Sequence, residues 1–229
     1  MGGCFSSAEP TGEQPQIKYQ QNQQKPEKQQ SKVSPIYPNL PKGAQKHKVR
    51  NVYDGDTLTL IDERRVRFLG IDTPELKEKQ AFAEEAKQHT KKFCHRKDIW
   101  ISFEGDQKDH YGRLLAFIWV PAIDNGRQTG YLNVNESLVS EGFATTYFVR
   151  GKKLATQNKL ILLQKEARKA RRGMWSIFQD YDVVTTVNGS AFHRRGCKHI
   201  EKIRNLKQMK ASLAMDNGLH PCRKCLADK

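Results

Sequence analysis

The sequence predicts an α+β protein, built on a small Greek-key barrel of five short strands with helices packed on it. Three observations support this prediction. Five segments alternate apolar and polar residues, the first 46 residues are too polar to form a core, and the last 47 contain four side chains with metal-ligand spacing. We therefore expect a disordered tether at residues 1–46, a barrel domain at 47–180 and a small metal-stabilised module at 183–229.

The N-terminal segment is rich in Gln, Lys and Pro and poor in large apolar side chains. It cannot bury enough apolar surface to offset the entropy lost on ordering, so we expect a disordered tether. Its start, MGGCFS, fits the pattern for myristoylation at Gly2. Because one myristoyl chain binds a membrane only marginally, palmitate on Cys4 would supply a second anchor. The alternative is a chance Met-Gly start followed by a cysteine with no function.

The five expected strands occupy the barrel domain, with tight polar turns between the first three. Their sequences are HKVRNVY, DTLTLI, RRVRFLGI, DIWISF and RLLAFIWV. Three helices are expected between and after them. The first spans residues 78–94, with a buried stripe formed by Phe82, Ala86, Thr90 and Phe93.

The second expected helix is short, and either Asn133 or Asn135 caps its N-terminus. It ends at Gly142, and the third helix spans approximately residues 153–171. Cys94, at the end of the first helix, is most simply a packing residue.

The charge balance and the cysteines restrict the class of protein. Lys and Arg outnumber Asp and Glu by 40 to 25, a formal net charge of +15, which attracts polyanions such as nucleic acid or an acidic membrane face. Five cysteines, three of them near the C-terminus, indicate a reducing compartment rather than a secreted disulfide framework. We expect neither a secretory signal peptide nor a membrane-spanning segment.

Acidic residues lie in two turns of the expected barrel. Asp54-Gly55-Asp56 lies between two strands, and Asp72-Thr73-Pro74-Glu75 follows a third. Carboxylates at strand ends can converge on a hard cation such as Ca²⁺, which prefers oxygen ligands. An Asp-Gly-Asp turn by itself is weak evidence for a metal site, because such turns commonly serve only as hairpin loops.

Two arginines accompany these acids. Arg67 lies in the strand that leads to Asp72, and Arg113 opens a later strand. A guanidinium group can grip phosphate oxygens in a bidentate way. A metal ion to polarise the phosphoryl group, arginines to neutralise charge and a carboxylate base are the parts that phosphodiester hydrolysis requires.

Four blocks of the chain resemble the successive core blocks of the thermonuclease, or staphylococcal-nuclease-like, family. They are VYDGDTLTL, RVRFLGIDTPE, DHYGRLLAFIWV and LNVNESLVSEGFA, within residues 47–178. The resemblance implies a five-stranded OB-fold barrel, which also suits nucleic-acid binding. It further implies a calcium-dependent endonuclease that hydrolyses DNA and RNA to 3′-phosphate and 5′-hydroxyl ends. The N-terminus is similar to that of membrane-tethered calcium-dependent nucleases of plants.

The resemblance assigns roles to residues that match the family pattern. Asp56 and Asp72 would bind Ca²⁺ through their carboxylates, and Thr73 through its backbone carbonyl. Glu75 would act as the general base or orient the attacking water.

The same resemblance implies a set of substrate contacts. Arg67 and Arg113 would clamp the scissile phosphate, and Arg113 would also stabilise the leaving 5′ oxygen. Tyr111 would contact a neighbouring nucleotide, and Tyr147 and Phe148 lie near the position where the family stacks a base.

The C-terminal segment carries four potential ligands for zinc. His193-x3-Cys197 is followed, after 24 residues, by Cys222-x2-Cys225, a set typical of structural Zn²⁺. The alternative is free cysteines with chance spacing. A unit this small cannot form a large core, so zinc would supply folding energy.

This segment resembles the zinc module of the adaptive-response alkylation-repair protein, with His193 in place of the family's first cysteine. His199 and His220 are competing ligand candidates. Six basic residues could follow a phosphate backbone or contact acidic lipid. They are Arg194, Arg195, Lys198, Lys202, Arg204 and Lys207.

Together these inferences predict a monomeric endonuclease that acts on single-stranded DNA and RNA. It would be tethered by lipid to the cytoplasmic face of a membrane, most simply the plasma membrane. Calcium would be catalytic and zinc structural. The alternative is a non-catalytic protein that holds nucleic acid on the barrel and zinc module, and a third interpretation is a lipid-surface scaffold. The complete set Asp56, Arg67, Asp72, Glu75 and Arg113 favours the enzyme.

Overall fold

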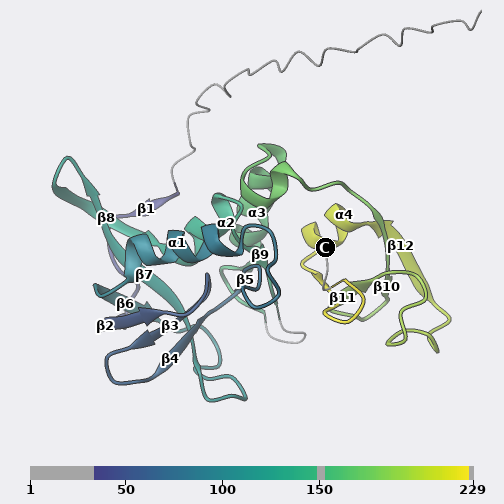
Figure 1. The fold of residues 1–229 in the computed structure, drawn as a ribbon, viewed down its shortest axis with the longest axis horizontal. Helices are drawn as coiled ribbons and strands as arrows, with labels where there is room; N and C mark the ends of the chain where they lie inside the picture. The colour runs from purple at the N-terminus through teal and green to yellow at the C-terminus, as the bar shows by residue number, and fades with distance from the viewer. Residues whose placement is uncertain (1–33, 149–152, 227–229) are drawn as a thin grey trace, which may run out of the picture. The chain divides into compact units, whose positions relative to one another are not determined.

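The computed structural model of the protein describes residues 34–148 and 153–226 (Figure 1). The expected lipid-anchor residues Gly2 and Cys4, and the expected tether as far as residue 33, lie outside the described residues. No helix in the part of the chain that is described is long and apolar enough to span a bilayer.

A closed five-stranded barrel forms the first part of the fold. Its strands are β2 (Gln45–Val52), β3 (Thr57–Leu60), β4 (Arg65–Phe68), β6 (Asp98–Ser102) and β7 (Leu114–Asp124). They pair in the order β7-β4-β3-β2-β6, and β6 pairs with β7 to close the barrel. Only the β4–β7 pair of this barrel is parallel. The five-stranded barrel expected from the alternating pattern is therefore confirmed.

Two strands extend the sheet beyond the barrel. β8 (Arg127–Asn133) forms a hairpin with β7, and β1 (Ile36–Tyr37) pairs with β8. The Tyr37 ring packs edge-on against Trp119, with 5.0 Å between ring centroids. Strand β1 and the start of β2 lie within the segment assigned to the tether, so the predicted boundary at residue 46 lies too far along the chain.

Three α-helices pack on the barrel: α1 (Ala83–Cys94), α2 (Val134–Ser140) and α3 (Gln157–Lys169). The helix α1 begins five residues later than expected, because Lys79 and Phe82 adopt positive φ angles of 51° and 67°. Left-handed backbone of this kind interrupts a right-handed helix.

The later start changes which side chains of α1 are buried. Ala83, Ala86, Thr90 and Cys94 face the core, whereas Phe82 and Phe93 are only partly buried. Cys94 is fully buried, in agreement with a packing role. In α2 the Asn133 side chain accepts a hydrogen bond from the backbone N–H of Glu136, so the predicted cap is present.

A short antiparallel ribbon beside the barrel places one of the acidic residues. It consists of β5 (Ile71–Asp72) and β9 (Thr145–Thr146), and it pairs Asp72 with Thr145. Ile71 is buried in the main core, so Asp72, the next residue along the strand, points to the other side.

The C-terminal module is a four-stranded sheet with one helix. A 3-10 turn, η1 (Gly173–Ser176), precedes it. The sheet order is β12-β10-β11-β13. The elements are β10 (Asp182–Thr186), β11 (Ala191–His193), β12 (Leu206–Lys210), α4 (Ala211–Asp216) and β13 (His220–Pro221).

A second, smaller core joins this module to α3. Ala167 of α3 and Trp175 of η1 belong to the same buried cluster as Phe192 and Met215 of the module. Arg168 Nη2 also contacts both carboxylate oxygens of Asp216 at 2.8 Å, and both side chains are about five-sixths buried, at 16% and 17% exposed. These contacts hold the module against α3.

Candidate active site

The three residues predicted to bind calcium, Asp56, Asp72 and Thr73, lie together beside Arg67. Arg67 Nη2 is 3.0 Å from Asp56 Oδ2 and 2.6 Å from Asp72 Oδ1. The backbone N–H of Thr73 donates to Asp56 Oδ2 at 2.8 Å. The turn between β2 and β3 therefore meets the ribbon strand β5 at one point, as the strand-end argument predicted.

The Asp-Gly-Asp turn is more than a hairpin loop, because it packs tightly against α1. A Cβ at Gly55 would lie 2.8 Å from Ala86 Cβ and from the Thr73 side chain. Thr90 Oγ1 donates to the Gly55 carbonyl at 2.5 Å. Only glycine fits here, and this contact places Asp56 in the interior, at 5% exposure.

The acidic residues repel one another in this half-buried setting. Burial, followed by the charge of Asp56, raises the pKa of Asp54 to about 6. Burial and the charges of Asp56 and Asp72 also raise the pKa of Glu75. Burial likewise raises the pKa of Asp72, although Arg67 opposes this. A divalent cation would relieve this repulsion, and oxygen donors of this kind suit Ca²⁺.

The guanidinium group of Arg67 stays charged in this environment. Burial disfavours the charged form, but the charges of Asp56 and Asp72 outweigh burial and raise its pKa. Its Nη1 also donates to the carbonyls of Phe68 and Ile71, at 2.7 and 2.8 Å. Three hydrogen-bond acceptors and the ion pair with Asp56 therefore fix the orientation of Arg67, which is the preorganisation that binding a charged substrate requires.

Arg67 shares a cleft of about 470 Å³ with the other residues predicted to hold substrate. Arg113 lines this cleft, and its Nε donates to Asp109 Oδ2 at 2.7 Å. Tyr111 is 73% exposed, and the guanidinium carbon of Arg113 lies 5.4 Å from its ring centre. Both predicted phosphate-clamping arginines and one aromatic therefore face the same space.

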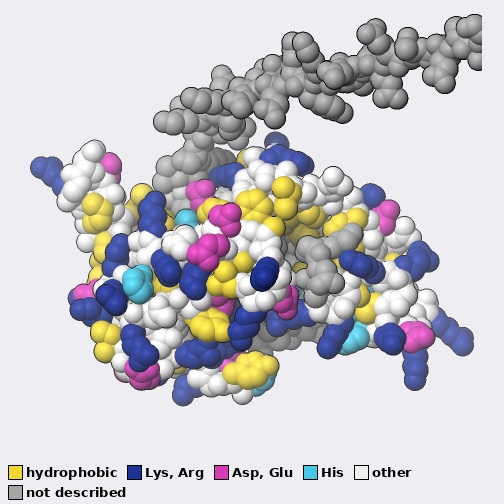
Figure 2. All heavy atoms as spheres, in the orientation of Figure 1, with side chains coloured by type: hydrophobic (Ala, Val, Ile, Leu, Met, Phe, Trp, Pro, Cys, Tyr) yellow, Lys and Arg dark blue, Asp and Glu magenta, His cyan; other side chains and the backbone are white. Residues whose placement is uncertain are grey.

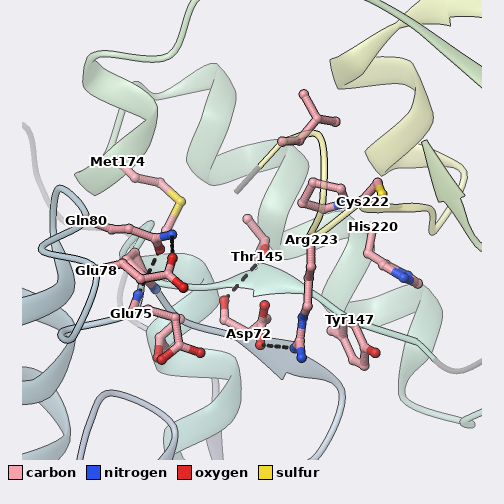
Figure 3. Close-up of a pocket in the computed structure, with 14 residues that line it drawn as sticks. Asp72, Glu75, Glu78, Gln80, Thr145, Tyr147, Met174, His220, Cys222 and Arg223 are labelled. Atoms are coloured by element: carbon pink, nitrogen blue, oxygen red, sulfur yellow. Dashed lines mark hydrogen bonds and ion pairs between the residues drawn. The ribbon is translucent and has the colours of Figure 1, made fainter. Parts of the chain in front are cut away.

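Glu75 lies in an adjoining cavity of about 270 Å³ (Figure 3). Asp72 and Thr73 line the same cavity, so the predicted base and two predicted metal ligands share it. Glu75 is exposed, and its backbone N–H donates to Gln80 Oε1 at 2.8 Å. A water molecule has free access to its carboxylate.

The expected aromatic pair does not form an open stacking surface. Phe148 is 6% exposed and belongs to the main core with Leu154 and Leu160. Tyr147 packs against His220 of the C-terminal module, with 4.6 Å between ring centroids. Both residues nevertheless line the 470 Å³ cleft, so base stacking by Tyr147 and Phe148 stays a prediction. Leu154 and Leu160 pack around the Phe148 ring close to Gly70.

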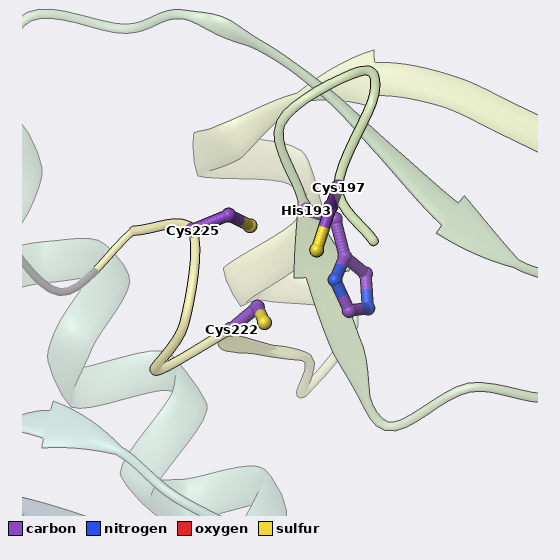
Figure 4. A group of neighbouring side chains, drawn as sticks. All are labelled: His193, Cys197, Cys222 and Cys225. Carbon is purple, nitrogen blue, oxygen red and sulfur yellow. The ribbon is translucent and has the colours of Figure 1, made fainter. Parts of the chain in front are cut away.

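The four predicted zinc ligands also meet, in a group that we call the Cys3His cluster: His193, Cys197, Cys222 and Cys225 (Figure 4). Their ligand atoms all lie within 4.8 Å of one another, and the cysteines form no disulfide. The competing candidates His199 and His220 do not belong to the cluster.

The donor chemistry of this cluster fits zinc. His193 Nδ1 is buried and has no hydrogen-bond partner, as expected for an atom that faces a metal ion. Burial, followed by the charge of His199, lowers the pKa of His193, which favours the neutral imidazole that binds metals. The backbone N–H of Arg194 donates to Cys225 Sγ at 3.4 Å, a contact that supports a thiolate.

Sequence reasoning missed one residue at this candidate site. Arg223 lies between Cys222 and Cys225, and its Nη2 is 3.2 Å from Asp72 Oδ1. Its position between two zinc-type cysteines was the only signal in the sequence, and that signal suggested a surface residue of a structural module.

The barrel holds Asp56 and Asp72 against Arg67, and Arg67 and Arg113 line one cleft, a set of side chains that suits phosphate-ester chemistry. Comparison with known proteins identifies the family. The family described as Staphylococcal nuclease homologue matches residues 65–177. The micrococcal nuclease of Shigella flexneri is 35% identical over 131 residues, which are 56% of this chain and 72% of that protein. The thermonuclease of Staphylococcus hyicus is 31% identical over 140 residues, 58% and 76% of the two chains.

An uncharacterized endonuclease of Escherichia coli is 33% identical over 132 residues, 56% of this chain and 76% of that protein. The chain belongs to the staphylococcal nuclease family and is a nuclease of that family. The family match ends at residue 177, so the C-terminal module lies beyond it.

Proposed function

We propose that this nuclease is calcium-dependent and, as a monomer, hydrolyses single-stranded DNA and RNA to 3′-phosphate and 5′-hydroxyl ends. The observation that supports the proposal best is the position of Arg67, held between Asp56 and Asp72 at the side of the cleft. Anionic ligands for a hard cation and a cationic ligand for phosphate are thus in direct contact. This is the arrangement that a metal-assisted cleavage of a phosphodiester needs.

The carboxylates of Asp56 and Asp72 and the backbone carbonyl of Thr73 would hold the calcium ion. Bound calcium supplies positive charge that polarises the phosphoryl group. Glu75, which is exposed in the cavity that Asp72 and Thr73 also line, accepts the proton of the attacking water at a carboxylate oxygen.

The two arginines bind the non-bridging oxygens of the scissile phosphate. Because three hydrogen bonds and the ion pair with Asp56 fix Arg67, little reorganisation is needed when negative charge grows on those oxygens. Arg113 is held by Asp109 and is more exposed, and we place it at the leaving 5′ oxygen.

The test is cleavage of end-labelled single-stranded DNA and RNA with Ca²⁺, with Mg²⁺ and with a chelator. We expect calcium-dependent cleavage that leaves 3′-phosphate ends and that Arg67→Ala abolishes. Arg65→Ala is the matched control, since Arg65 is an exposed arginine in the same strand. Binding without cleavage in every metal would instead establish the non-catalytic alternative.

We also propose that the Cys3His cluster holds a structural Zn²⁺ ion. Four soft and borderline donors within 4.8 Å suit tetrahedral zinc, and the module's own core is small. Zinc would then supply folding energy that apolar burial alone cannot provide.

The positive charge of the chain supports a polyanionic partner. Figure 2 shows Lys and Arg side chains over both the barrel and the C-terminal module, in keeping with the net charge of +15. We propose that exposed basic residues of the module follow the phosphate backbone of the substrate. They are Arg194, Arg195, Lys198, Lys202, Arg204 and Lys207.

We further propose that lipid on Gly2 and Cys4 tethers the enzyme to the cytoplasmic face of a membrane. The support is the MGGCFS sequence alone. Gly2→Ala should move the full-length protein from the membrane to the soluble fraction of cells. Gly3→Ala is the matched control and should leave it on the membrane, and continued membrane association of Gly2→Ala would refute the tether.

A further inference from the structure

Arg223 belongs to the C-terminal module by sequence but lies at the nuclease site (Figure 3). Its Nη2 is 3.2 Å from Asp72 Oδ1, and its guanidinium carbon is 5.2 Å from the centre of the Tyr147 ring. Arg223 and Tyr147 are the two residues that line both the 470 Å³ cleft and the 270 Å³ cavity. The guanidinium group therefore lies at the junction of the space lined by Arg67 and Arg113 and the space lined by Glu75.

We propose that Arg223 is a third phosphate-binding arginine of the nuclease, supplied by the C-terminal module and positioned by the Cys3His cluster. This inference rests on the proposed function of the barrel site. The ligand is a phosphate of single-stranded nucleic acid next to the scissile one, since Arg67 and Arg113 already occupy the cleft on one side of Arg223.

The charges around Arg223 favour a phosphate over a permanent ion pair. Asp72 Oδ1 already accepts a hydrogen bond from Arg67 at 2.6 Å, so its contact with Arg223 is the weaker of the two. Once Asp72 binds a divalent cation, the cation and the Arg223 guanidinium repel each other. Arg223 is then free to bind another anion in the same space, and the substrate supplies one.

Because Arg223 is exposed, exchanging its contact with Asp72 for a phosphate costs little free energy. Its side chain is 66% exposed, so the guanidinium is still largely hydrated and can turn without burying an unpaired charge. The Tyr147 ring beside it supports the planar group by a cation–π contact. Arginine on an aromatic ring at the edge of a cleft is a suitable receptor for a phosphodiester.

The Cys3His cluster determines where Arg223 lies. Arg223 is between two of the four ligands, Cys222 and Cys225, so a metal ion bound by both would fix the loop that carries it. The backbone N–H of Cys222 donates to the Phe192 carbonyl at 2.9 Å, and that of Leu226 donates to the Cys222 carbonyl at 2.9 Å. These bonds join the loop to the module's sheet through its backbone, and a bound metal ion would add ligation of the Cys222 and Cys225 thiols.

The module has a second attachment that aims this loop at the barrel. The Arg168–Asp216 ion pair holds α4 against α3, and His220 packs on Tyr147 directly beside Arg223. Metal ligation in the module and phosphate binding at the barrel are therefore mechanically connected through one short loop.

The test compares Arg223→Gln with Lys224→Gln in the full-length, zinc-loaded protein. Lys224 is the adjacent residue in the same loop, is exposed, and lines neither cavity, so its loss removes the same charge without the same contact. Both are placed in a Glu75→Gln background, and binding of a fluorescent single-stranded tetranucleotide is measured with calcium present. The short probe spans the two cavities and little of the outlying basic surface.

We expect Arg223→Gln to weaken binding about 10-fold, the scale of one hydrogen bond to a charged group. The slope of log K against log salt should also fall by about 0.7, the value for one lost phosphate contact on a single strand. Lys224→Gln should change neither quantity, and Arg223→Lys should restore part of the affinity.

Unchanged binding in Arg223→Gln would overturn the inference. Tighter calcium binding together with tighter tetranucleotide binding would also overturn it. Arg223 would then compete with calcium for Asp72 and would not bind the substrate. If the wild-type protein, with Arg223 and Glu75 intact, neither binds nor cleaves nucleic acid, the proposed function fails instead. Failure of this inference and failure of the proposed function are therefore distinguishable.

The role of the cluster is tested with a chelator selective for zinc over calcium. Zinc removal should weaken tetranucleotide binding about as much as Arg223→Gln does, and it should add little in the Arg223→Gln protein. An equal further loss in that variant would show that zinc does not act through Arg223 and would overturn the connection between the two sites.

Discussion

Replacing Asp56 by Asn should remove the stabilisation of the fold by calcium. The side chain is nearly buried, and its Oδ2 accepts a hydrogen bond from the Thr73 N–H and forms an ion pair with Arg67. Asparagine keeps the shape and can still accept the Thr73 hydrogen bond, so the substitution removes mainly a charge. The loss of a charged ligand lowers the affinity of a site that depends on carboxylate charge for Ca²⁺.

The expected magnitude follows from the linkage between binding and folding. Calcium at 100 times its dissociation constant adds about 2.7 kcal/mol to the free energy of unfolding. For a protein of this size, about 2–4 °C per kcal/mol gives a rise in melting temperature of about 5–11 °C. Wild-type protein should show this rise, and Asp56→Asn should show none.

The Asp56→Asn variant should remain folded without calcium. Removing one partner of an isolated buried ion pair costs about 3–5 kcal/mol. Here the cost is smaller, because Arg67 keeps Asp72 at 2.6 Å and because Asp54 and Glu75 lose a repulsive neighbour. The pKa of Asp54 should accordingly fall below its wild-type value of about 6.

Scanning calorimetry with calcium and with chelator measures both the calcium-induced rise in melting temperature and the stability of the calcium-free variant. Asp98→Asn is the matched control: Asp98 is exposed, pairs with Lys46 and lies away from the cleft, so this variant should keep the full calcium response. A calcium-induced rise in Asp56→Asn equal to that of wild type would refute the assignment of Asp56 as a calcium ligand.

Three other predictions concern the base, a buried carboxyl group and the C-terminal module. Glu75→Gln should lower kcat by about 10²–10⁴, the usual contribution of a general base, while calcium still binds, and unchanged kcat would exclude that role. Burial raises the pKa of Glu136 to about 7, so the folded state holds its proton more tightly than the unfolded state. The free energy of unfolding should therefore fall as pH rises from about 4.5 to 7. Glu136→Gln should remove part of this fall in urea titrations, and an identical pH profile would contradict the argument. Zinc chelation should speed amide hydrogen exchange in residues 182–226 while the barrel strands stay protected, and unchanged exchange there would exclude a structural zinc.

The barrel was predictable because its signals are local. Each strand alternates apolar and polar residues, so the face that joins the core can be read from a few neighbours, as in RVRF of β4. Asn133 could be proposed as a cap because capping depends on a residue three positions away. The spacing of His193, Cys197, Cys222 and Cys225 similarly predicted that these four meet, although His199 and His220 remained competing candidates until the structure was known.

Features that depend on distant partners were not predictable from such signals. Strand β1 exists because Ile36 and Tyr37 find β8 nearly 100 residues later. The late start of α1 reflects left-handed backbone at Phe82 that no spacing rule indicates. The burial of Phe148 depends on α3 packing over it.

By itself, then, the sequence determined the class of barrel, the residue types of the proposed phosphodiester-cleaving site and the four side chains that meet in the Cys3His cluster. Only the tertiary structure decided that this module reaches the nuclease site through Arg223. The physical reason is that hydrophobic periodicity and ligand spacing report on each segment separately. The meeting of Arg223 with Asp72 depends on how α3, α4 and the module pack together, through contacts such as Arg168–Asp216 that join residues 48 positions apart.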